Sequence, residues 1–322
     1  MGVLIRPNAA EPSAAEPNAA EPNAIEPNAI GATLGLLGDE WTLLIVRGAF
    51  EGARRYGDWK SALPISDAVL TTRLQSLVDA DVLRRDGAAY ALTTSGLDLW
   101  LVLLCIWDWE QRQVPRRAPL PRMVHTGCGS AFHPVLRCGV CGNDAHSTQV
   151  HARFSPGGSF ERSAPVGNNR RRASSARRGT SGPGMFADTM AIVGNRWSSA
   201  VLGAAFLGAT RFRDFEQIGA PPSTVADRLR RFVELGVFAP PDPDSTDYRL
   251  TTKGRAFFPV VVAFLQWGER WRPAADGPSV EATHQSCGAA FVPAWRCSEC
   301  NGALTRIGVG IERVTPRVDV EV

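Results

Sequence analysis

Eight cysteine and histidine residues of this chain form two motifs with identical spacing, and their residue types are those that bind zinc. Each motif reads His-x2-Cys-x9-Cys-x2-Cys, and every member of the second lies 159 positions after its counterpart in the first. Zn²⁺ prefers four tetrahedral nitrogen and sulfur ligands, and a Cys-x2-Cys pair supplies two thiolates around a short turn. The first motif is His125, Cys128, Cys138 and Cys141, and the second is His284, Cys287, Cys297 and Cys300.

We expect each motif to close one structural zinc site of its own, with the nine-residue interval folded as a small hairpin that returns the chain to its first ligand pair. All four ligands are protein groups, so no coordination position remains for substrate. The alternative is that the cysteines are reduced thiols packed under a loop, and the repeated spacing favours metal over that interpretation. His133, His146 and His151 have no counterpart in the repeat and are expected at the surface. Cys105 lies on an apolar helix face and is expected to pack there.

The repetition extends to the segments before each motif. Residues 38–41, 56–59 and 90–94 have close counterparts at 194–197, 212–215 and 248–252. A duplicated unit is the economical explanation.

In the first unit, apolar residues from Leu36 to Ile45 fall at helical spacing, and a short helix is expected near residues 56–63. Ser66 is a good N-cap for a helix whose buried stripe is Leu70, Leu74 and Leu77. Residues 82–85 and 89–93 flank Asp86 and Gly87 as the two strands of a hairpin, and a long apolar helix covers about 95–112. In the second unit the stripe is Val225, Leu229 and Phe232, and Pro222 suits a first helical turn.

This order predicts a mainly α fold with small β wings: two winged helix-turn-helix domains in tandem, each with a small zinc-knuckle hairpin. The strings GDEWTLLIVR, RYGDW, ISDAVLTTRLQSLVDADVL and YALTTSG, with NRW, RFRDF, TVADRL and YRLTTKG in the second copy, resemble the HxlR-type family of bacterial winged-helix transcription regulators. The resemblance covers about half the chain. It implies DNA-binding proteins that are usually single-domain dimers, so two copies in one chain look like a covalently linked dimer.

A recognition helix in the major groove would present its exposed face to base edges, while wing residues would hold phosphates. Arg230 is the better candidate for a guanine edge, and Gln75 can pair with adenine. The alternative is that these are simply solvated helix faces. The candidate DNA-binding residues are Ser66, Asp67, Ala68, Thr71, Thr72, Arg73, Gln75, Arg84 and Arg85 in the first unit, and Ser223, Thr224, Ala226, Asp227, Arg228, Arg230 and Arg231 in the second.

Charge is unequal between the two units. The first wing carries Arg84 and Arg85, whereas the second reads Asp242, Asp244 and Asp247, and an acidic wing cannot grip phosphate. We therefore expect asymmetric half-sites. Arginines at 170–172 and 177–178 either contact DNA between the units or belong to a soluble spacer.

The chain has 322 residues, 44% of them apolar, and a formal net charge of +3, which permits nucleic-acid binding without requiring it. No secretory signal or bilayer-spanning run is apparent, so a cytoplasmic, nucleoid-associated protein is expected. The expected segments are a disordered Glu-Pro-Asn-Ala repeat arm (1–30), winged helix 1 (31–115), zinc knuckle 1 (122–145), a basic flexible linker (146–184), winged helix 2 (185–273), zinc knuckle 2 (281–305) and a tail (306–322).

The sequence shows no motif for a catalytic nucleophile, no phosphate-binding loop and no carboxylate pair, so we do not expect an enzyme. The leading interpretation is a sequence-specific double-stranded DNA-binding transcription regulator that acts as a fused pseudo-dimer, and further homodimerisation is open. The alternative is a zinc-stabilised protein-interaction adaptor. A small-molecule effector is a further option, with Leu101, Trp107, Phe264 and Trp267 either lining a pocket or forming a dimer-like core. Family members that sense oxidants use a cysteine before the first helix, whereas this chain has Ile30-Gly31-Ala32 there.

Overall fold

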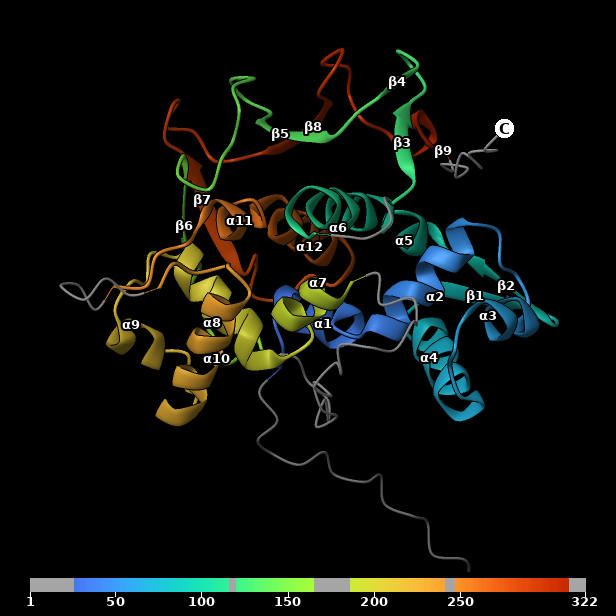
Figure 1. Ribbon diagram of the computed structural model, residues 1–322, viewed down its shortest axis with the longest axis horizontal. Coiled ribbons are helices and arrows are strands. Elements are labelled where there is room, and N and C mark those ends of the chain that lie inside the picture. The colour runs from blue at the N-terminus through green and yellow to red at the C-terminus, as the bar shows by residue number, and fades with distance from the viewer. Residues whose placement is uncertain (1–25, 116–119, 165–185, 241–246, 313–322) are drawn as a thin grey trace, which may run out of the picture.

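Two helical units with the same order of helices lie side by side beneath a layer of short strands (Figure 1). The computed structural model describes residues 26–115, 120–164, 186–240 and 247–312. The first unit contains α1 (Ala29–Leu37), α2 (Glu40–Phe50), α3 (Tyr56–Ala62), α4 (Asp67–Asp79), β1 (Leu83–Asp86), β2 (Ala89–Leu92), α5 (Thr94–Leu97) and α6 (Trp100–Gln113). The second contains α7 (Ala187–Val193), α8 (Arg196–Phe206), α9 (Phe212–Glu216), α10 (Pro222–Glu234), α11 (Thr252–Arg255) and α12 (Phe258–Trp271). The expected mainly helical, tandem architecture is confirmed.

Capping residues explain where the helices of the first unit begin. The carboxylate of Asp39 accepts a hydrogen bond from the backbone N–H of Thr42 at 3.1 Å, and the hydroxyl of Ser66 caps α4 as expected. The periodic segment before Ile45 is broken into α1 and α2 at Gly38, because Asp39 starts a new helix there. A Cβ at Gly38 would lie 2.4 Å from the carbonyl oxygen of Leu34, so the turn between α1 and α2 requires glycine at this position.

The first wing is a two-stranded hairpin in which Leu83 pairs with Leu92 and Asp86 with Ala89. Gly87, at φ 58°, takes the left-handed conformation that such a tight turn requires. In the second unit, the corresponding segments meet in an isolated bridge between Phe238 and Leu250. Asp242 and Asp244 of the expected acidic wing lie outside the described residues.

The two units share one hydrophobic core. α12 packs against α1 and α6, and α7 packs against α6, so the terminal helices of each unit contact the other unit. Two tryptophans repeat the same cross-unit hydrogen bond: Trp109 Nε1 donates to the carbonyl of Lys253 at 3.1 Å, and Trp267 Nε1 to that of Ser95 at 2.9 Å. Because donor and acceptor are each displaced by 158 positions, these bonds indicate a pseudo-twofold relation between the units.

The strand layer also crosses between the two halves. It contains β3 (Arg122–His125), β4 (Ser130–Ala131), β5 (Pro134–Cys138), β6 (Val150–Phe154), β7 (Val280–His284), β8 (Pro293–Cys297), η1 (Arg306–Gly308) and β9 (Val309–Glu312). β3 pairs with β9, β5 with β8 and β6 with β7, all antiparallel. Each of these pairs joins a strand of the first half to one of the second.

The expectation of a flexible linker from residue 146 is wrong for its first part. β6 is paired with β7 along its whole length, and the loop after it contacts the start of α1. There the backbone N–H of Asn28 donates to the carbonyl of Arg162 at 3.1 Å, and Asn28 Nδ2 donates to Ser163 Oγ at 2.8 Å. The apolar alternation of Val150, Ala152 and Phe154 is the signal for this strand. Most of the expected repeat arm, 1–25, and the basic stretch at 165–185 lie outside the described residues.

No single helix in the described ranges is long and apolar enough to span a membrane, although α1 and α2 together, bent by 79°, have the length and composition for a broken span.

Candidate metal clusters and nucleic-acid-binding surface

The eight motif residues gather into two clusters, and each cluster takes half of its members from each motif. His125 and Cys128 lie with Cys297 and Cys300, whereas Cys138 and Cys141 lie with His284 and Cys287. The expectation that each motif closes its own site is therefore wrong in its pairing.

The antiparallel pairing of β5 with β8 explains the exchange. Pro134 lies opposite Cys297, and Cys138 lies opposite Pro293. A five-residue strand covers roughly 13 Å between its end residues, so β5 carries Cys138 away from His125 instead of returning to it. The same displacement on β8 brings Cys297 to His125. The period-two burial of Pro134, Leu136 and Cys138 is the signal that the interval is a strand and not a return hairpin.

The spacing of the ligand atoms suits a tetrahedral ion. In the first cluster, His125 Nδ1 lies 3.5 Å from Cys128 Sγ and 3.2 Å from Cys300 Sγ, and the sulfurs of Cys128 and Cys297 are 3.9 Å apart. Within each cluster all four ligand atoms lie within 4.8 Å of one another. Ligands of a tetrahedral zinc at ordinary bond lengths are about 3.5–3.8 Å apart. Each cluster can therefore hold one metal ion with four protein ligands.

The second cluster repeats this geometry. His284 Nδ1 lies 3.4 Å from Cys141 Sγ and 3.5 Å from Cys287 Sγ, while its Nε2 lies 3.3 Å from the carbonyl oxygen of Asp144. A hydrogen bond from Nε2–H to that carbonyl leaves Nδ1 free as a ligand, which is the usual arrangement around a metal-bound histidine. Both histidines are buried, so their rings are fixed by packing.

The thiols differ in exposure and acidity. Cys138 and Cys297 are buried, whereas Cys128, Cys287 and Cys300 are exposed. Backbone N–H donation from Ser130 and a hydrogen bond with His125 lower the pKa of Cys128 to about 6. For Cys138, burial raises the pKa, but the backbone N–H groups of Cys141 and Val140 and the neighbouring thiols bring it down to about 7. Thiolate is the form that binds metal, so both environments favour coordination.

Cys105 and the histidines outside the motifs take no part in the clusters. Cys105 is buried in α6, and burial raises the pKa of its thiol well above the ordinary value, which agrees with a packing role. His146 and His151 are exposed as expected, whereas His133 is half-buried. Burial lowers the pKa of His133.

The expected recognition helix of the first unit, α4, presents its polar face to solvent. Asp67, Ala68, Thr71, Thr72 and Gln75 are exposed, while Leu70, Leu74 and Leu77 are buried. The Asp67 carboxylate accepts hydrogen bonds from Tyr56 Oη at 2.7 Å and Lys60 Nζ at 2.9 Å, which hold α3 against the start of α4. These two partners lower the pKa of Asp67.

In the second unit, α10 is less uniformly exposed. Ser223, Asp227, Arg230 and Arg231 are exposed, whereas Thr224, Ala226 and Arg228 are half-buried. Arg230 forms an ion pair with Asp227 at 2.8 Å, and Arg231 forms one with Glu234 at 3.1 Å. Such exposed pairs are weak, so these guanidinium groups can exchange their partners for phosphate or a base.

Two arginines predicted at the DNA surface are turned into the fold. Arg73 lies with its Nε 2.9 Å from Asp39 Oδ1 and donates from a terminal nitrogen to Oδ2 at 2.9 Å, which ties α4 to the N-cap of α2. At the corresponding place in the second unit, the buried Nε of Arg228 has no hydrogen-bond partner in the described part of the chain. The guanidinium group of Arg73 is therefore already paired with a carboxylate of the protein. Sequence periodicity alone did not reveal its partner 34 positions earlier.

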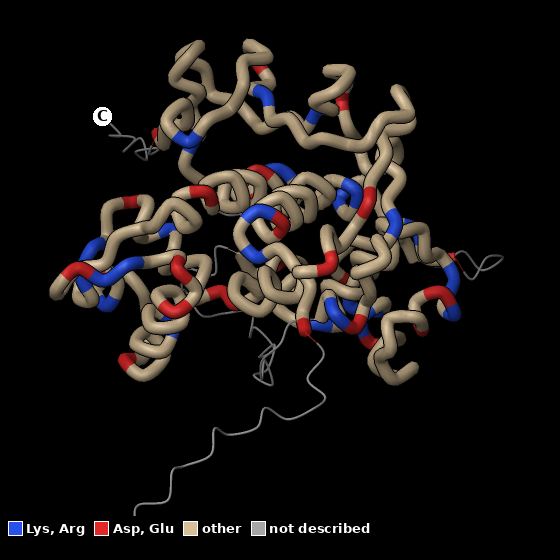
Figure 2. The backbone as a smooth tube through the Cα atoms, turned by 180° about the vertical axis from the view of Figure 1, so that it is seen from behind, with Lys and Arg blue, Asp and Glu red and all other residues tan. Residues whose placement is uncertain are grey.

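Both expected recognition helices project from the side of the molecule opposite the strand layer that carries the Cys/His clusters (Figure 1). Basic and acidic residues are interspersed around both units in Figure 2. In the first wing, Arg84 and Arg85 are exposed on β1. Asp247, the described member of the acidic wing, contacts Arg211 and Arg249. The basic residues 170–172 and 177–178 lie outside the described ranges.

Comparison with known proteins gives consistent matches to one family. The HxlR-like helix-turn-helix family matches the chain twice, at residues 36–118 and 192–276. An uncharacterized HTH-type transcriptional regulator of Mycobacterium tuberculosis (strain CDC 1551 / Oshkosh) is 37% identical over 119 residues, which are 35% of this chain and 75% of the relative. One of Synechocystis sp. (strain ATCC 27184 / PCC 6803 / Kazusa) is 32% identical over 90 residues, covering 24% and 67%. These relatives are described as transcriptional regulators and not as enzymes.

Two solved structures also match. PA1607, described as a candidate transcription factor, is 34% identical, with 42% of this chain and 96% of that one covered and a TM-score of 0.35. PA1374 of Pseudomonas aeruginosa, described likewise, is 27% identical, with coverage of 42% and 97% and a TM-score of 0.32.

Proposed function

Because the chain belongs to the HxlR-like helix-turn-helix family, and its matched relatives are described as HTH-type transcriptional regulators, we propose that it is a sequence-specific double-stranded DNA-binding regulator working as a fused pseudo-dimer. The observation that carries this proposal is the projection of α4 and α10 from the same side of one shared core (Figure 1). A rigid pair of helices on one side can enter two successive major grooves of a duplex. We expect such a protein to act in the cytoplasm, on the nucleoid.

Fusion makes the second DNA contact intramolecular. Once one helix is bound, the other is held near its half-site at an effective concentration set by the core and not by the concentration of protein. The packing of α12 against α1 and α6 supports this role, because it keeps the two units from moving independently.

The two units would read DNA differently. In the first, Thr71, Thr72 and Gln75 face the bases, and Arg84 and Arg85 bind phosphate from the wing. In the second, Arg230 leaves Asp227 to meet a guanine, and Ser223 and Arg231 contact the backbone. The half-sites of the operator are then unequal in sequence.

We infer that the two clusters bind structural zinc. Three sulfurs and one nitrogen at tetrahedral spacing are a donor set that zinc prefers, and four protein ligands leave no position for substrate. Because each cluster joins both halves, zinc bound there would fix the strand layer across the pseudo-twofold relation.

Selection from random duplexes, followed by affinity measurements at several salt concentrations, tests the proposal. Replacing Arg84 and Arg85 together with alanine is expected to weaken binding to all sequences and to reduce the salt slope by about one for each phosphate that is no longer neutralised. Arg306→Ala, which removes a positive charge from the strand layer, is the control and is expected to leave both unchanged.

Arg230→Ala is expected to weaken binding roughly tenfold or more at the selected sequence, and less at unrelated sequences. If the wild type selects no sequence, the regulator proposal fails and the adaptor alternative is favoured. If Arg230→Ala lowers affinity equally for all duplexes, the assignment of Arg230 to a base is wrong.

A further inference from the structure

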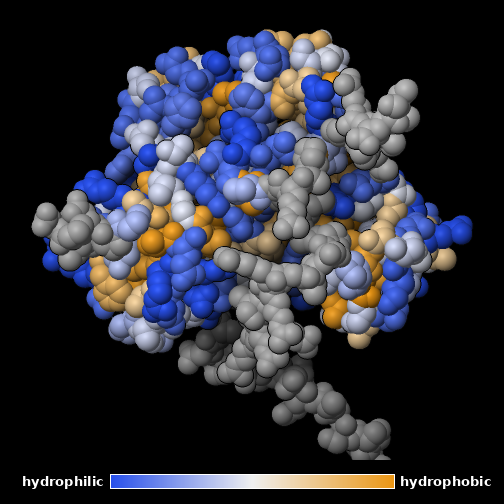
Figure 3. Space-filling view, viewed as in Figure 1, coloured by the Kyte–Doolittle hydropathy of each residue, from blue (hydrophilic) through white to orange (hydrophobic). Residues whose placement is uncertain are grey.

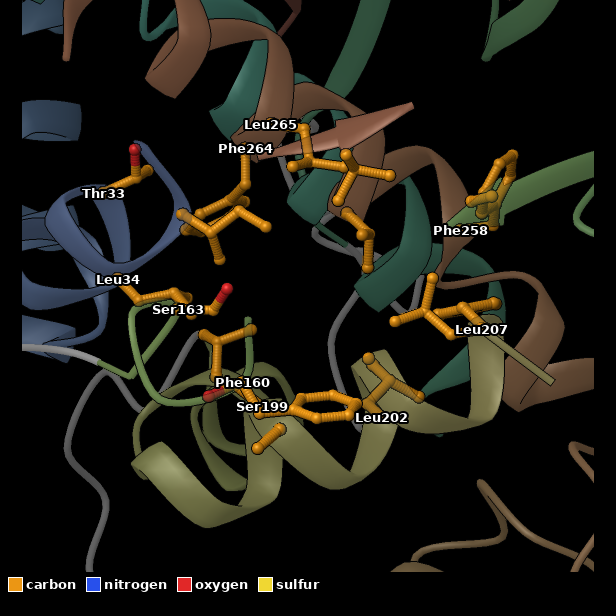
Figure 4. A pocket seen from close by; sticks show the side chains of 18 of the residues that line it. Thr33, Leu34, Phe160, Ser163, Ser199, Leu202, Leu207, Phe258, Phe264 and Leu265 are labelled. Atoms are coloured by element: carbon orange, nitrogen blue, oxygen red, sulfur yellow. The ribbon is translucent and has the colours of Figure 1, made fainter. Parts of the chain in front are cut away.

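A cavity of about 140 Å³ opens between α8, α12, α1 and the paired strands β6 and β7 (Figure 4). We propose that it binds a small uncharged apolar molecule, with an aromatic ring or a short alkyl chain. Side chains from all these elements line it, among them Leu34, Phe154, Leu202, Phe206, Phe258 and Phe264. Hydrophobic surface is visible in the part of the molecule where α8 lies (Figure 3).

The lining explains why the ligand should be uncharged. None of the described residues around the cavity is charged, and its three hydroxyl groups already have partners within the protein. Thr33 Oγ1 donates to the carbonyl of Ala29 at 2.7 Å, Ser199 Oγ donates to that of Arg196 at 3.0 Å, and Ser163 Oγ accepts from Asn28 Nδ2 at 2.8 Å. A charged ligand would lose its hydration without finding an opposite charge, whereas an apolar one gains by leaving water.

Small residues on α8 create the space. Ser199, Ala200 and Gly203 line the cavity, and the corresponding positions on α2, 156 residues earlier, carry Leu43, Leu44 and Arg47. Leu43 and Leu44 are almost fully buried. A Cβ placed on Gly203 would meet no atom within 4 Å. The second unit therefore has open space at positions where the first unit is filled by large side chains.

The size of the cavity sets the size of the ligand. An engineered apolar protein cavity of about 150 Å³ stays free of water and binds benzene. The present cavity, at about 140 Å³, is close to that volume, so one six-membered ring fits within it.

This cavity replaces the site considered from sequence. Phe264 lines it as suggested, but Leu101, Trp107 and Trp267 are buried in the shared core instead. α8, one wall of the cavity, packs against α10, so a ligand that shifts α8 would also move the expected recognition helix. That consequence rests on the proposed function, whereas binding of the ligand does not.

Fluorobenzene is a suitable probe, because fluorine NMR detects its binding without DNA. The full-length wild type is expected to bind one molecule saturably, with a dissociation constant in the millimolar range or below. Gly203→Leu is expected to weaken binding about tenfold or more by filling the space. Gly57→Leu, at an exposed glycine whose Cβ also meets nothing, is the matched control and should bind as the wild type does.

Ala200→Leu, which copies Leu44, is a second filling variant, and circular dichroism and thermal unfolding verify that each variant folds. The proposal is overturned if the wild type shows no saturable binding, or if both folded filling variants bind fluorobenzene as tightly as the wild type. Light scattering covers another occupant: a wild-type dimer that becomes monomeric in Gly203→Leu would assign the cavity to a second copy of the chain and overturn the proposal. None of these outcomes depends on DNA binding, so failure here leaves the regulator proposal standing.

Discussion

The first and second winged units have the same order of helices but differ in the side chains that pack around their shared centre. Their shared centre keeps the paired tryptophan bonds of Trp109 and Trp267. Away from that centre, α2 is packed with leucines where α8 has small residues. The ion pair of Arg73 with Asp39 in the first unit is likewise replaced in the second by Arg228 and a neutral asparagine. The tryptophan contacts between the units are therefore the same in both copies, whereas α2 and α8 carry side chains of different size.

Metal removal is expected to have the largest effect, because a structural zinc contributes on the order of 10 kcal/mol to folding. The crossed clusters predict which double variants lose one ion and which lose two. Cys128→Ser with Cys297→Ser removes ligands of a single cluster and should leave one zinc per chain, whereas Cys128→Ser with Cys138→Ser should leave none. Elemental analysis of the purified variants measures this, with Cys105→Ser as the control that keeps both ions. The opposite pattern would mean that each motif closes its own site.

The packing difference between α2 and α8 predicts unequal effects of exchanged residues. Leu44→Ala, which gives the first unit the alanine of the second, should lower the free energy of unfolding by about 2–5 kcal/mol, because it leaves a cavity in a filled core. Ala200→Leu should cost much less, since its side chain enters existing space. Chemical denaturation measures both. Equal losses would contradict the comparison.

Asp108 on α6 has the uncharged Gln266 as its counterpart on α12, so the pH dependence that Asp108 contributes has no equivalent at that position of the second unit. Burial raises the pKa of Asp108 to about 6, although Arg112 at 2.9 Å opposes this. The folded protein therefore holds this proton more tightly than the unfolded chain, and stability falls as pH rises from about 4 to about 6.

Asp108→Asn removes that ionisation and should raise the free energy of unfolding at pH 7 by on the order of 2 kcal/mol. Denaturation of wild type and variant across this pH range measures the effect as their difference. Parallel curves for the two proteins would show that Asp108 is not the group responsible.

The smallest effect is expected at the two inward-turned arginines. Arg73→Ala removes two contacts to Asp39 and should cost about 1–2 kcal/mol of unfolding free energy. Arg228→Ala should cost less, because Asn195, which stands where Asp39 does, is neutral and caps α8 through the N–H groups of Trp197 and Ser198. Thermal unfolding of the two variants side by side is the measurement. A larger loss of unfolding free energy for Arg228→Ala than for Arg73→Ala would show that the contacts of Arg73 with Asp39 are not the more stabilising of the two.

Local signals were enough to predict the capped α4 and the first wing, because Ser66, the Leu70–Leu74–Leu77 stripe and the turn at Gly87 act over a few residues. They did not reveal the break between α1 and α2, or the break that divides the helix expected over 95–112 into α5 and α6. Spacing also identified all eight members of the clusters. It could not identify the pairing, because within-motif and crossed sites have the same ligands, and only the register of β5 on β8 separates them. The ion pair of Arg73 with Asp39 was not predicted for a similar reason, since the two residues are distant in sequence. The cavity depends on residues that are small, and a missing side chain leaves no periodic pattern.

Because each cluster combines residues of both motifs, binding of metal would depend on how far synthesis of the chain has proceeded. During synthesis His125 and Cys128 emerge well before Cys297 and Cys300, so neither cluster has a complete donor set until its members from the second motif have been made. A prematurely terminated product would expose incomplete thiol pairs and could not acquire either ion in this arrangement. Metal binding at the proposed zinc sites would then distinguish a chain that contains both motifs from one that stops between them.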